Sequence, residues 1–173
     1  MERIDIFDSR GRKTGKTATK TQAHRHGYWH TAAHVWIFCK GKVLLQKRAA
    51  VSAINPCKWD ISSAGHVSAG EYPKRTALRE LHEELGLHLL PERLKKVKVM
   101  PGQIRLGKVI NNEFYHVYFC KMMLPKKLVL QKEEVSAVKL FTKKELRTAL
   151  QKNPKAFVEH GDYWQFILSQ HWS

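Results

Sequence analysis

The stretch Gly65–Leu87, GHVSAGEYPKRTALRELHEELGL, decides how this chain folds around its chemistry. We expect a helix from about Pro73, because proline suits a first turn, where its missing N–H would have no partner. Gly86 follows the last apolar position of the pattern, where a left-handed residue ends many helices. At 3.6 residues per turn, one face carries the apolar side chains. These are Ala77, Leu78, Leu81 and Leu85.

The opposite face of this predicted helix is acidic. Glu80, Glu83 and Glu84 recur at i, i+3 and i+4, where like charges repel one another by a few tenths of a kcal/mol per pair. Arg75 and Arg79 offset only part of that repulsion. Three acids alone favour the interpretation of a solvated helix face. The alternative is a binding site for a hard divalent cation such as Mg²⁺, which prefers carboxylate oxygens and would relieve the repulsion.

The spacing around the acids decides between these alternatives. Gly65, Glu71, Arg79-Glu80, Glu83-Glu84 and Gly86-Leu87 fill every fixed position of a frame that resembles the Nudix box. The resemblance implies a loop–helix–loop that holds Mg²⁺ or Mn²⁺ against a diphosphate. It also implies an α/β/α sandwich, with a mixed β-sheet between helices.

The same resemblance assigns roles within the box. Glu80, Glu83 and Glu84 match the acids that bind the metal and position the base. Glu71 matches the acid that pairs with Arg79 and joins the loop to the helix. The backbone at Gly65 matches the turn that offers a carbonyl to the metal.

Length and composition indicate one domain over residues 1–173 of this 173-residue chain. We expect an N-terminal hairpin over residues 1–22, the box over 65–87 and C-terminal helices over about 142–172. No run of about 18 apolar residues predicts a membrane span, and the first residues lack an apolar signal core. Three cysteines without a C-x-x-C pair suit a reducing compartment, so we predict a cytoplasmic protein.

The basic charge is a separate observation. Lysine and arginine total 31 against 15 acids, a net charge of +16, which could attract nucleic acid or a polyanionic substrate. The basic residues are scattered, and no nucleic-acid motif is present. We therefore expect a small-molecule diphosphate as the partner rather than nucleic acid or membrane.

Other elements follow from alternation, turn residues and caps. Thr142 with Glu145 forms a capping box, so a helix should begin there. Asn111-Asn112 indicates a turn, and Pro101-Gly102 should separate two strands. The predicted strands are 3–8, 33–39, 43–48, 94–100, 103–110, 113–120 and 134–141, with a last helix over 162–171.

Several residues outside the box are candidates for the site. Histidines at 24, 26, 30 and 34 lie within one short segment, which suits either a metal or hydrogen-bonded structural roles. Arg48 ends a strand and could bind a phosphate or form a surface ion pair. Trp59 is either part of the core or a wall for the substrate. Glu113 leads a β-prone run and could reach the metal.

A wider resemblance covers about residues 20–145. The segments AHRHGYWHTAAHVWIF (23–38), LLQKR (44–48), PCKWD (56–60), SSAGHVSAGE (62–71) and NNEFYHVY (111–118) resemble the branch that contains type 1 isopentenyl-diphosphate isomerases and related hydrolases. That resemblance implies a metal site of His24, His30 and His66 with Glu113.

Two departures separate this chain from the isomerases of that branch. Ala64 stands where they use a cysteine, and Asn111 stands where they use an acid. Isomerisation needs groups that deliver and remove protons at carbon, which alanine cannot do. The complete set of helix acids instead predicts a metal-dependent hydrolase of a nucleoside diphosphate linked to a group X, or of another organic diphosphate. The alternatives are an isomerase-like protein, a basic nucleic-acid-binding module and a catalytically idle sensor domain.

Overall fold

The computed structural model describes residues 2–52 and 54–172. Met1, Ala53 and Ser173 lie outside the described residues, so the first residue of the predicted hairpin and both ends of the predicted domain do as well. The elements in chain order are β1 (Arg3–Phe7), β2 (Lys13–Thr19), α1 (Lys20–His26), β3 (Trp29–Cys39), β4 (Lys42–Arg48), β5 (Trp59–Asp60), β6 (Ser63–His66), α2 (Pro73–Leu85), η1 (Pro91–Arg93), β7 (Lys95–Leu106), β8 (Val109–Lys121), β9 (Val135–Thr142), α3 (Lys143–Lys152), η2 (Pro154–Ala156) and α4 (Tyr163–Ser169).

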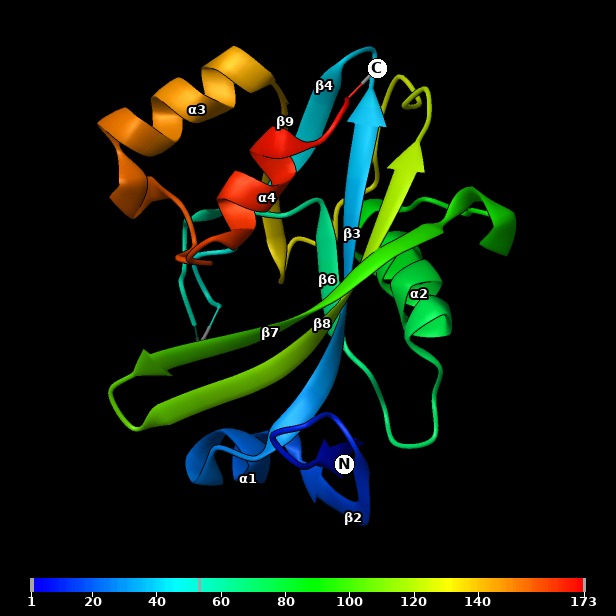
Figure 1. The fold of residues 1–173 in the computed structure, drawn as a ribbon. Helices are drawn as coiled ribbons and strands as arrows, with labels where there is room; N and C mark the ends of the chain where they lie inside the picture. The colour runs from blue at the N-terminus through cyan, green and yellow to red at the C-terminus, as the bar shows by residue number, and fades with distance from the viewer. Residues whose placement is uncertain (1, 53, 173) are drawn as a thin grey trace.

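Strand β3 is the centre of a mixed sheet. It pairs in parallel with β8 along Trp29–Phe38, and it pairs antiparallel with β6 and β4. Helix α2 lies on one side of these strands, and α3 and α4 lie on the other (Figure 1). This arrangement confirms the predicted α/β/α sandwich and mixed sheet.

The two faces of β3 carry two separate cores, because successive side chains of a strand point to opposite faces. Trp36 and Phe38 face the C-terminal helices and pack in one cluster with Ile167 of α4. Ile37 packs on the other face, in one cluster with Leu81 of α2. The sheet is therefore buried on both faces, and β3 reads as an almost continuous apolar run.

The N-terminal segment forms the predicted hairpin, but only as far as Thr19. Strands β1 and β2 pair antiparallel, and helix α1 then begins at Lys20, so the prediction of a hairpin for residues 20–22 is wrong. Thr19 and Gln22 form a capping box, and Gly27 ends the helix with φ 64°. The sequence signal for this helix is the Thr19–Gln22 capping pair, which lies within a Lys/Thr-rich segment. Because α1 forms here, His24 lies on a helix rather than on a strand of the hairpin.

The β7–β8 hairpin differs from the expectation in two places. Pro101-Gly102 does not divide two strands, and Asn111-Asn112 is not a turn but lies inside β8. The turn is at Gly107, where φ is 58°. Among the described strands β7 pairs with β8 alone, so it is an edge strand, where proline is tolerated.

The box helix begins at Pro73 and ends before Gly86, whose φ is 68°, as predicted. Ala77, Leu81 and Leu85 are fully buried. The prediction for Glu84 is wrong, because this acid is 3% exposed and does not lie on the solvent face. The side of the helix that contacts β6 and β4 is broader than its apolar stripe, so it also buries Glu84.

The C-terminal part keeps the predicted caps and helices. Thr142 and Glu145 form the expected capping box at the start of α3. Helix α4 is shorter than residues 162–171 but contributes the expected apolar side chains to the core. Cys39 and Cys120 are buried free thiols, and Cys57 is exposed.

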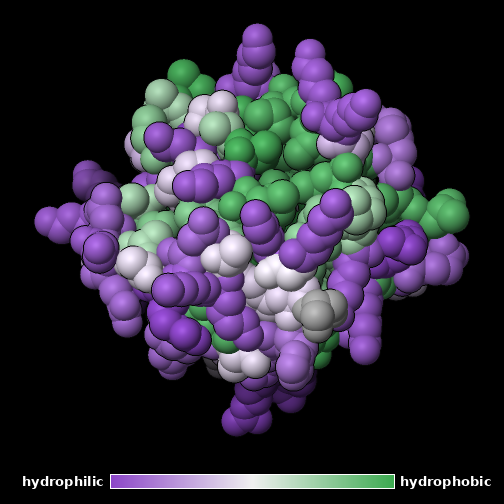
Figure 2. All heavy atoms as spheres, turned by 90° about the horizontal axis from the view of Figure 1, so that it is seen from above, coloured by the Kyte–Doolittle hydropathy of each residue, from purple (hydrophilic) through white to green (hydrophobic). Residues whose placement is uncertain are grey.

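One face of the molecule carries hydrophilic and hydrophobic side chains together (Figure 2). Figure 2 shows one end of the molecule, where hydrophilic side chains project around a central apolar band. Within the described residues, no helix is both long enough and apolar enough to cross a membrane.

We predict that Leu81→Ala destabilises the fold by about 2–5 kcal/mol, because it opens a cavity between α2 and the sheet. Leu81 is 0% exposed. Leu90→Ala is the matched control, since Leu90 is 71% exposed, and it should change stability by no more than about 0.5 kcal/mol. Urea unfolding followed by circular dichroism measures both. Equal midpoints for the two variants would contradict the placement of α2.

Candidate metal-binding cleft

A cleft of about 300 Å³ brings the box and the histidine segment together. Its walls come from the box helix, from β6, from α1 and from the start of β8. The lining residues that sequence analysis had singled out are His24, Arg48, Gly65, His66, Arg79, Glu80, Glu83, Glu84 and Glu113. Segments distant in the chain therefore contribute to one site.

The loop of the box is held to its helix through Arg79. This guanidinium lies 3.6 Å from Glu71, 2.8 Å from Glu80 and 3.0 Å from Glu83. Thr76 Oγ1 also donates a hydrogen bond of 2.7 Å to Glu71. The predicted pairing of Glu71 with Arg79 is present, and Arg79 leaves part of the acidic charge uncompensated.

Gly65 is required by the close approach of Glu80. A Cβ atom at Gly65 would overlap the Glu80 carboxylate. Burial raises the pKa of Glu80 to about 7, with Arg79 opposing the rise and Glu83 adding to it. The backbone of β6 and this carboxylate therefore share one confined space, in which the charged form lacks sufficient solvation.

Glu84 is the most buried acid of the box. Its Oε1 accepts from Gln46 Nε2 at 3.4 Å, and its Oε2 accepts from the backbone N–H of Ala64 at 3.2 Å. Burial raises the pKa of Glu84 to about 8, and the charge of Glu80 contributes to the rise. Two adjacent carboxyls with raised pKa values in a cleft are characteristic of a functional site.

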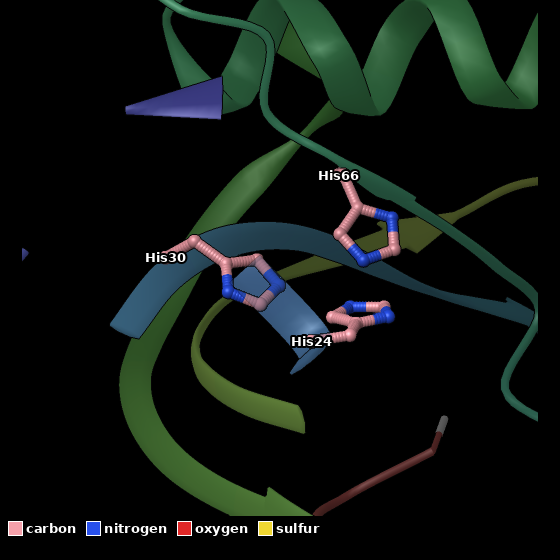
Figure 3. Close-up of side chains that lie close together, drawn as sticks. All are labelled: His24, His30 and His66. Carbon is pink, nitrogen blue, oxygen red and sulfur yellow. The ribbon is translucent and has the colours of Figure 1, made fainter. Parts of the chain in front are cut away.

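Three imidazoles converge at the other end of the cleft, where His24 and His66 line the wall and His30 is fully buried behind them. His24 comes from α1, His30 from β3 and His66 from β6, and one ring nitrogen of each lies within 4.8 Å of the others (Figure 3). The Nε2 atom of His24 is buried and lacks a hydrogen-bond partner among the described residues, whereas the buried Nε2 atoms of His30 and His66 face Glu113. His30 Nδ1 lies 2.9 Å from the carbonyl oxygen of Tyr28. When Nδ1 donates to this carbonyl, Nε2 is the nitrogen left to bind a metal, as in metal-binding histidines.

Glu113 completes this histidine cluster. Its Oε1 lies 3.4 Å from His30 Nε2 and 3.2 Å from His66 Nε2, and its Oε2 accepts from Asn111 Nδ2 at 2.8 Å. Burial opposes ionisation of Glu113, but hydrogen bonds from His30 and His66 lower its pKa well below the ordinary value. Burial, with the neighbouring imidazoles, lowers the pKa of His24 to about 4. One carboxylate and neutral imidazoles form a donor set that fits a divalent cation.

Two other predicted residues have different surroundings. Arg48 lines the cleft, but its Nη1 lies 3.4 Å from Asp60 and its Nε donates to the carbonyl of Ile54, so it forms the ion pair that was one of the two alternatives. Trp59 packs edge-on against Phe141 and belongs with the core cluster rather than with the cleft residues. That placement favours the packing alternative for Trp59.

Three buried cleft residues were missed. His34 was noted only as part of the histidine segment, and Asp60 and His160 were not considered. Asp60 Oδ1 lies 2.7 Å from His160 Nε2, although the two residues are 100 positions apart. No spacing rule connects positions so distant, and only the folded chain brings them together.

Comparisons with known proteins identify related chains. A family model described as NUDIX domain matches residues 28–161. Nudix hydrolase 3 of Arabidopsis thaliana is 42% identical over 172 residues, which cover 94% of this chain and 22% of that protein. An isopentenyl-diphosphate Delta-isomerase of Cutibacterium acnes is 31% identical over 135 residues, which cover 73% of this chain and 65% of that protein. The chain therefore spans about a fifth of the Arabidopsis relative and just under two thirds of the Cutibacterium relative.

The fold also has a close match among solved structures. A crystal structure of a Deinococcus radiodurans protein superimposes with a TM-score of 0.71 at 19% identity, covering 96% of this chain and 97% of that chain. At that identity, the likeness concerns the fold alone. The family model, by contrast, spans well over half of the sequence, and the matched residues include the acidic box helix. The chain therefore belongs to the Nudix hydrolase family.

Proposed function

We propose that this chain is a metal-dependent hydrolase that cleaves a diphosphate linkage in a small organic molecule. One observation carries the proposal: Glu80 and Glu84 are largely buried at a cleft wall, and the absence of a side chain at Gly65 leaves room for the Glu80 carboxylate. Burying two acids that are only partly compensated destabilises the fold. A divalent cation would offset that cost, which supports a cation site in the cleft.

The box residues fit such a cation. Glu80, Glu83 and Glu84, with the carbonyl of Gly65, would hold Mg²⁺ or Mn²⁺, and Arg79 with Glu71 would keep the helix acids in place. A bound cation supplies positive charge for the diphosphate oxygens and lowers the pKa of nearby water. In the protein without a cation, burial raises the pKa of Glu84 to about 8, whereas the pKa of Glu113 lies well below its ordinary value. We therefore assign proton acceptance from the attacking water to Glu84 rather than to Glu113.

The histidine cluster supports a second cation in the same cleft. His24, His30 and His66 offer three converging ring nitrogens, and Glu113 offers an ionised carboxylate beside two of them. Imidazole ligands favour transition metals, whereas Mg²⁺ prefers oxygen ligands. We therefore assign Mn²⁺ or a similar ion to this cluster and Mg²⁺ or Mn²⁺ to the box.

The substrate is a diphosphate linked to a group X, which includes nucleoside diphosphate derivatives. The net charge of +16 raises the local concentration of such anions without requiring a nucleic-acid site. A single catalytic domain over residues 1–173 and a cytoplasmic location are part of the proposal.

Isomerisation of isopentenyl diphosphate is the second candidate. The cluster of His24, His30, His66 and Glu113 favours it, as does the similarity to a protein named as such an isomerase. Ala64 argues against it, because this residue lines the cleft with a methyl group and cannot exchange a proton with carbon. Hydrolysis is therefore the better-supported reaction.

One screen tests both candidates. Purified protein is incubated with nucleoside diphosphate derivatives, other organic diphosphates and isopentenyl diphosphate, each with Mg²⁺ and with Mn²⁺. Phosphate or monophosphate products support hydrolysis. Formation of dimethylallyl diphosphate at enzymatic rates would show that the protein is an isomerase rather than a hydrolase. The absence of product from every compound would count against both functions.

We predict that Glu84→Gln lowers kcat for the best substrate by about 100-fold or more, because it removes the proton acceptor while keeping the shape of the side chain. Glu83→Gln should mainly weaken metal binding, since Glu83 is more exposed and pairs with Arg79. Glu92→Gln is the matched control, because Glu92 is exposed and lies outside the cleft. Unchanged turnover of both box variants at saturating Mg²⁺ would contradict the assignment.

We predict an inverse dependence of stability on pH in the metal-free protein. The pKa values of Glu80 and Glu84 are raised from 4.5 to about 7 and about 8, so the folded state binds more protons than the unfolded state above about pH 4.5. The stability that these two acids contribute is therefore full below that pH and is lost as pH rises through 7 and 8. Below about pH 6.5 the lowered pKa values of His24 and His34 act in the opposite direction, so melting temperatures in EDTA between pH 7 and pH 9 measure the loss. Glu84→Gln should flatten the profile, and a wild-type melting temperature that rises over this range would refute the pKa assignment.

We predict that His66→Asn abolishes tight Mn²⁺ binding but leaves weak Mg²⁺ binding by the box. His66 contributes one of the three converging nitrogens, whereas the box acids offer only oxygen. Metal content after dialysis against Mn²⁺, read by mass spectrometry, measures the loss without any assay of turnover. His88→Asn serves as control, since His88 is exposed and remote from the cluster. Equal Mn²⁺ content in both variants would exclude the cluster as a metal site.

A further inference from the structure

A second constellation of polar and charged groups lines the cleft outside both proposed cation sites. It consists of Asp60 on β5 and His160 in the loop before α4, with Arg48 on β4. Asp60 Oδ1 lies 2.7 Å from His160 Nε2 and also accepts from the backbone N–H of Ile61 at 2.8 Å. None of the three residues belongs to the Nudix box or to the histidine cluster.

The protonation of this pair follows from its surroundings. Burial would raise the pKa of Asp60, but His160 and Arg48 overcome that effect and lower it to about 2. Asp60 is therefore ionised at neutral pH, and His160 Nε2 must carry the hydrogen that joins them. The other ring nitrogen, Nδ1, is buried and has no hydrogen-bond partner within the described chain.

The ring of His160 is fixed in one place. The backbone N–H of Val158 donates to the carbonyl of Trp59 at 2.9 Å, which fastens the loop to β5 beside Asp60. Three aromatic rings then surround the imidazole. Their centroids lie 5.6 Å (Tyr163), 5.8 Å (Trp164) and 6.2 Å (Tyr115) from its own.

His160 also stands at a boundary. A neighbouring hollow of about 610 Å³ shares Asn55, Ile104, Tyr115 and His160 with the metal-binding cleft. A substrate held at the acids of the box would therefore pass this ring if its remaining part occupied the hollow. A rigid, oriented imidazole with one free nitrogen at such a boundary is more than packing requires, because an unpartnered buried nitrogen lowers stability.

We propose that His160, oriented by Asp60, binds an oxygen of the substrate's diphosphate through Nδ1. The inference rests on the proposed function, because it concerns the same cleft. The anionic diphosphate favours the protonated ring, whose Nδ1–H then donates a charge-assisted hydrogen bond to it. Asp60 is a positioning residue in this arrangement, since it holds the ring and does not touch the ligand.

Two amide substitutions separate this role from a structural one. In His160→Asn the amide nitrogen falls near the position of Nδ1, so a donor toward the ligand is kept and the bond to Asp60 is lost. In His160→Gln the amide nitrogen falls near the position of Nε2, so the bond to Asp60 is kept and the donor to the ligand is lost. A structural role predicts that Gln is the better replacement, whereas a ligand contact predicts that Asn is.

Binding of methylenediphosphonate with Mg²⁺, measured by calorimetry, is the test. This probe has a bridging carbon and cannot be hydrolysed, so the test does not depend on turnover. We expect His160→Gln to weaken binding by about tenfold and His160→Asn to weaken it less. His171→Gln, at an exposed position outside the cleft, is the control and should bind as the wild type does.

The outcomes distinguish the two proposals. If the wild type binds the probe, His160→Gln weakens binding and no diphosphate is hydrolysed, the inference stands and the proposed hydrolysis fails. If hydrolysis is found but His160→Gln binds the probe as tightly as the wild type, His160 is only structural and the inference is overturned. Tighter binding by His160→Gln than by His160→Asn would overturn it as well.

Discussion

The packing of the box helix over a glycine is the constraint on which the rest of the site depends. The Glu80 carboxylate occupies the space that a side chain at position 65 would fill. Leu81 and Leu85 fasten the same helix to the sheet through a fully buried cluster. The apolar stripe and the acids thus lie on the same helix. The free energy gained by burying the apolar side chains offsets the cost of placing carboxylates in the cleft.

Strand β6 connects this constraint to the second set of ligands. Gly65 lies under Glu80, and the next residue, His66, belongs to the histidine cluster. Adjacent residues of a strand point to opposite sides, but the glycine has no side chain to place, so its backbone approaches the helix while His66 approaches His30. The two proposed cation sites therefore share one strand, and a shift of β6 would move both of them.

The box and the sandwich could be predicted because their signals are local. Pro73 and Gly86 bound the helix through backbone preferences alone, and Thr142 with Glu145 specifies a cap within four residues. The burial of Glu84 could not be predicted, since it depends on how widely the helix rests on β4 and β6. Gln46, which contacts Glu84, is 38 positions away. The preference of asparagine for turns predicts a turn at Asn111-Asn112. This prediction is wrong because the pairing of β8 with its neighbouring strands overrides that preference.

The two parts of the cleft differ in the pKa values of the groups that could bind a cation. The box offers carboxylates whose raised pKa values make cation binding compete with protons near neutral pH. His24 and His66 of the histidine cluster have lowered pKa values, so each is neutral there and has one ring nitrogen without a proton. A cation at these two histidines would therefore compete less with protons than a cation at the box. At the box, a cation would balance the acidic charge that Arg79 leaves uncompensated, and it would at the same time offer positive charge to the phosphate oxygens of a substrate.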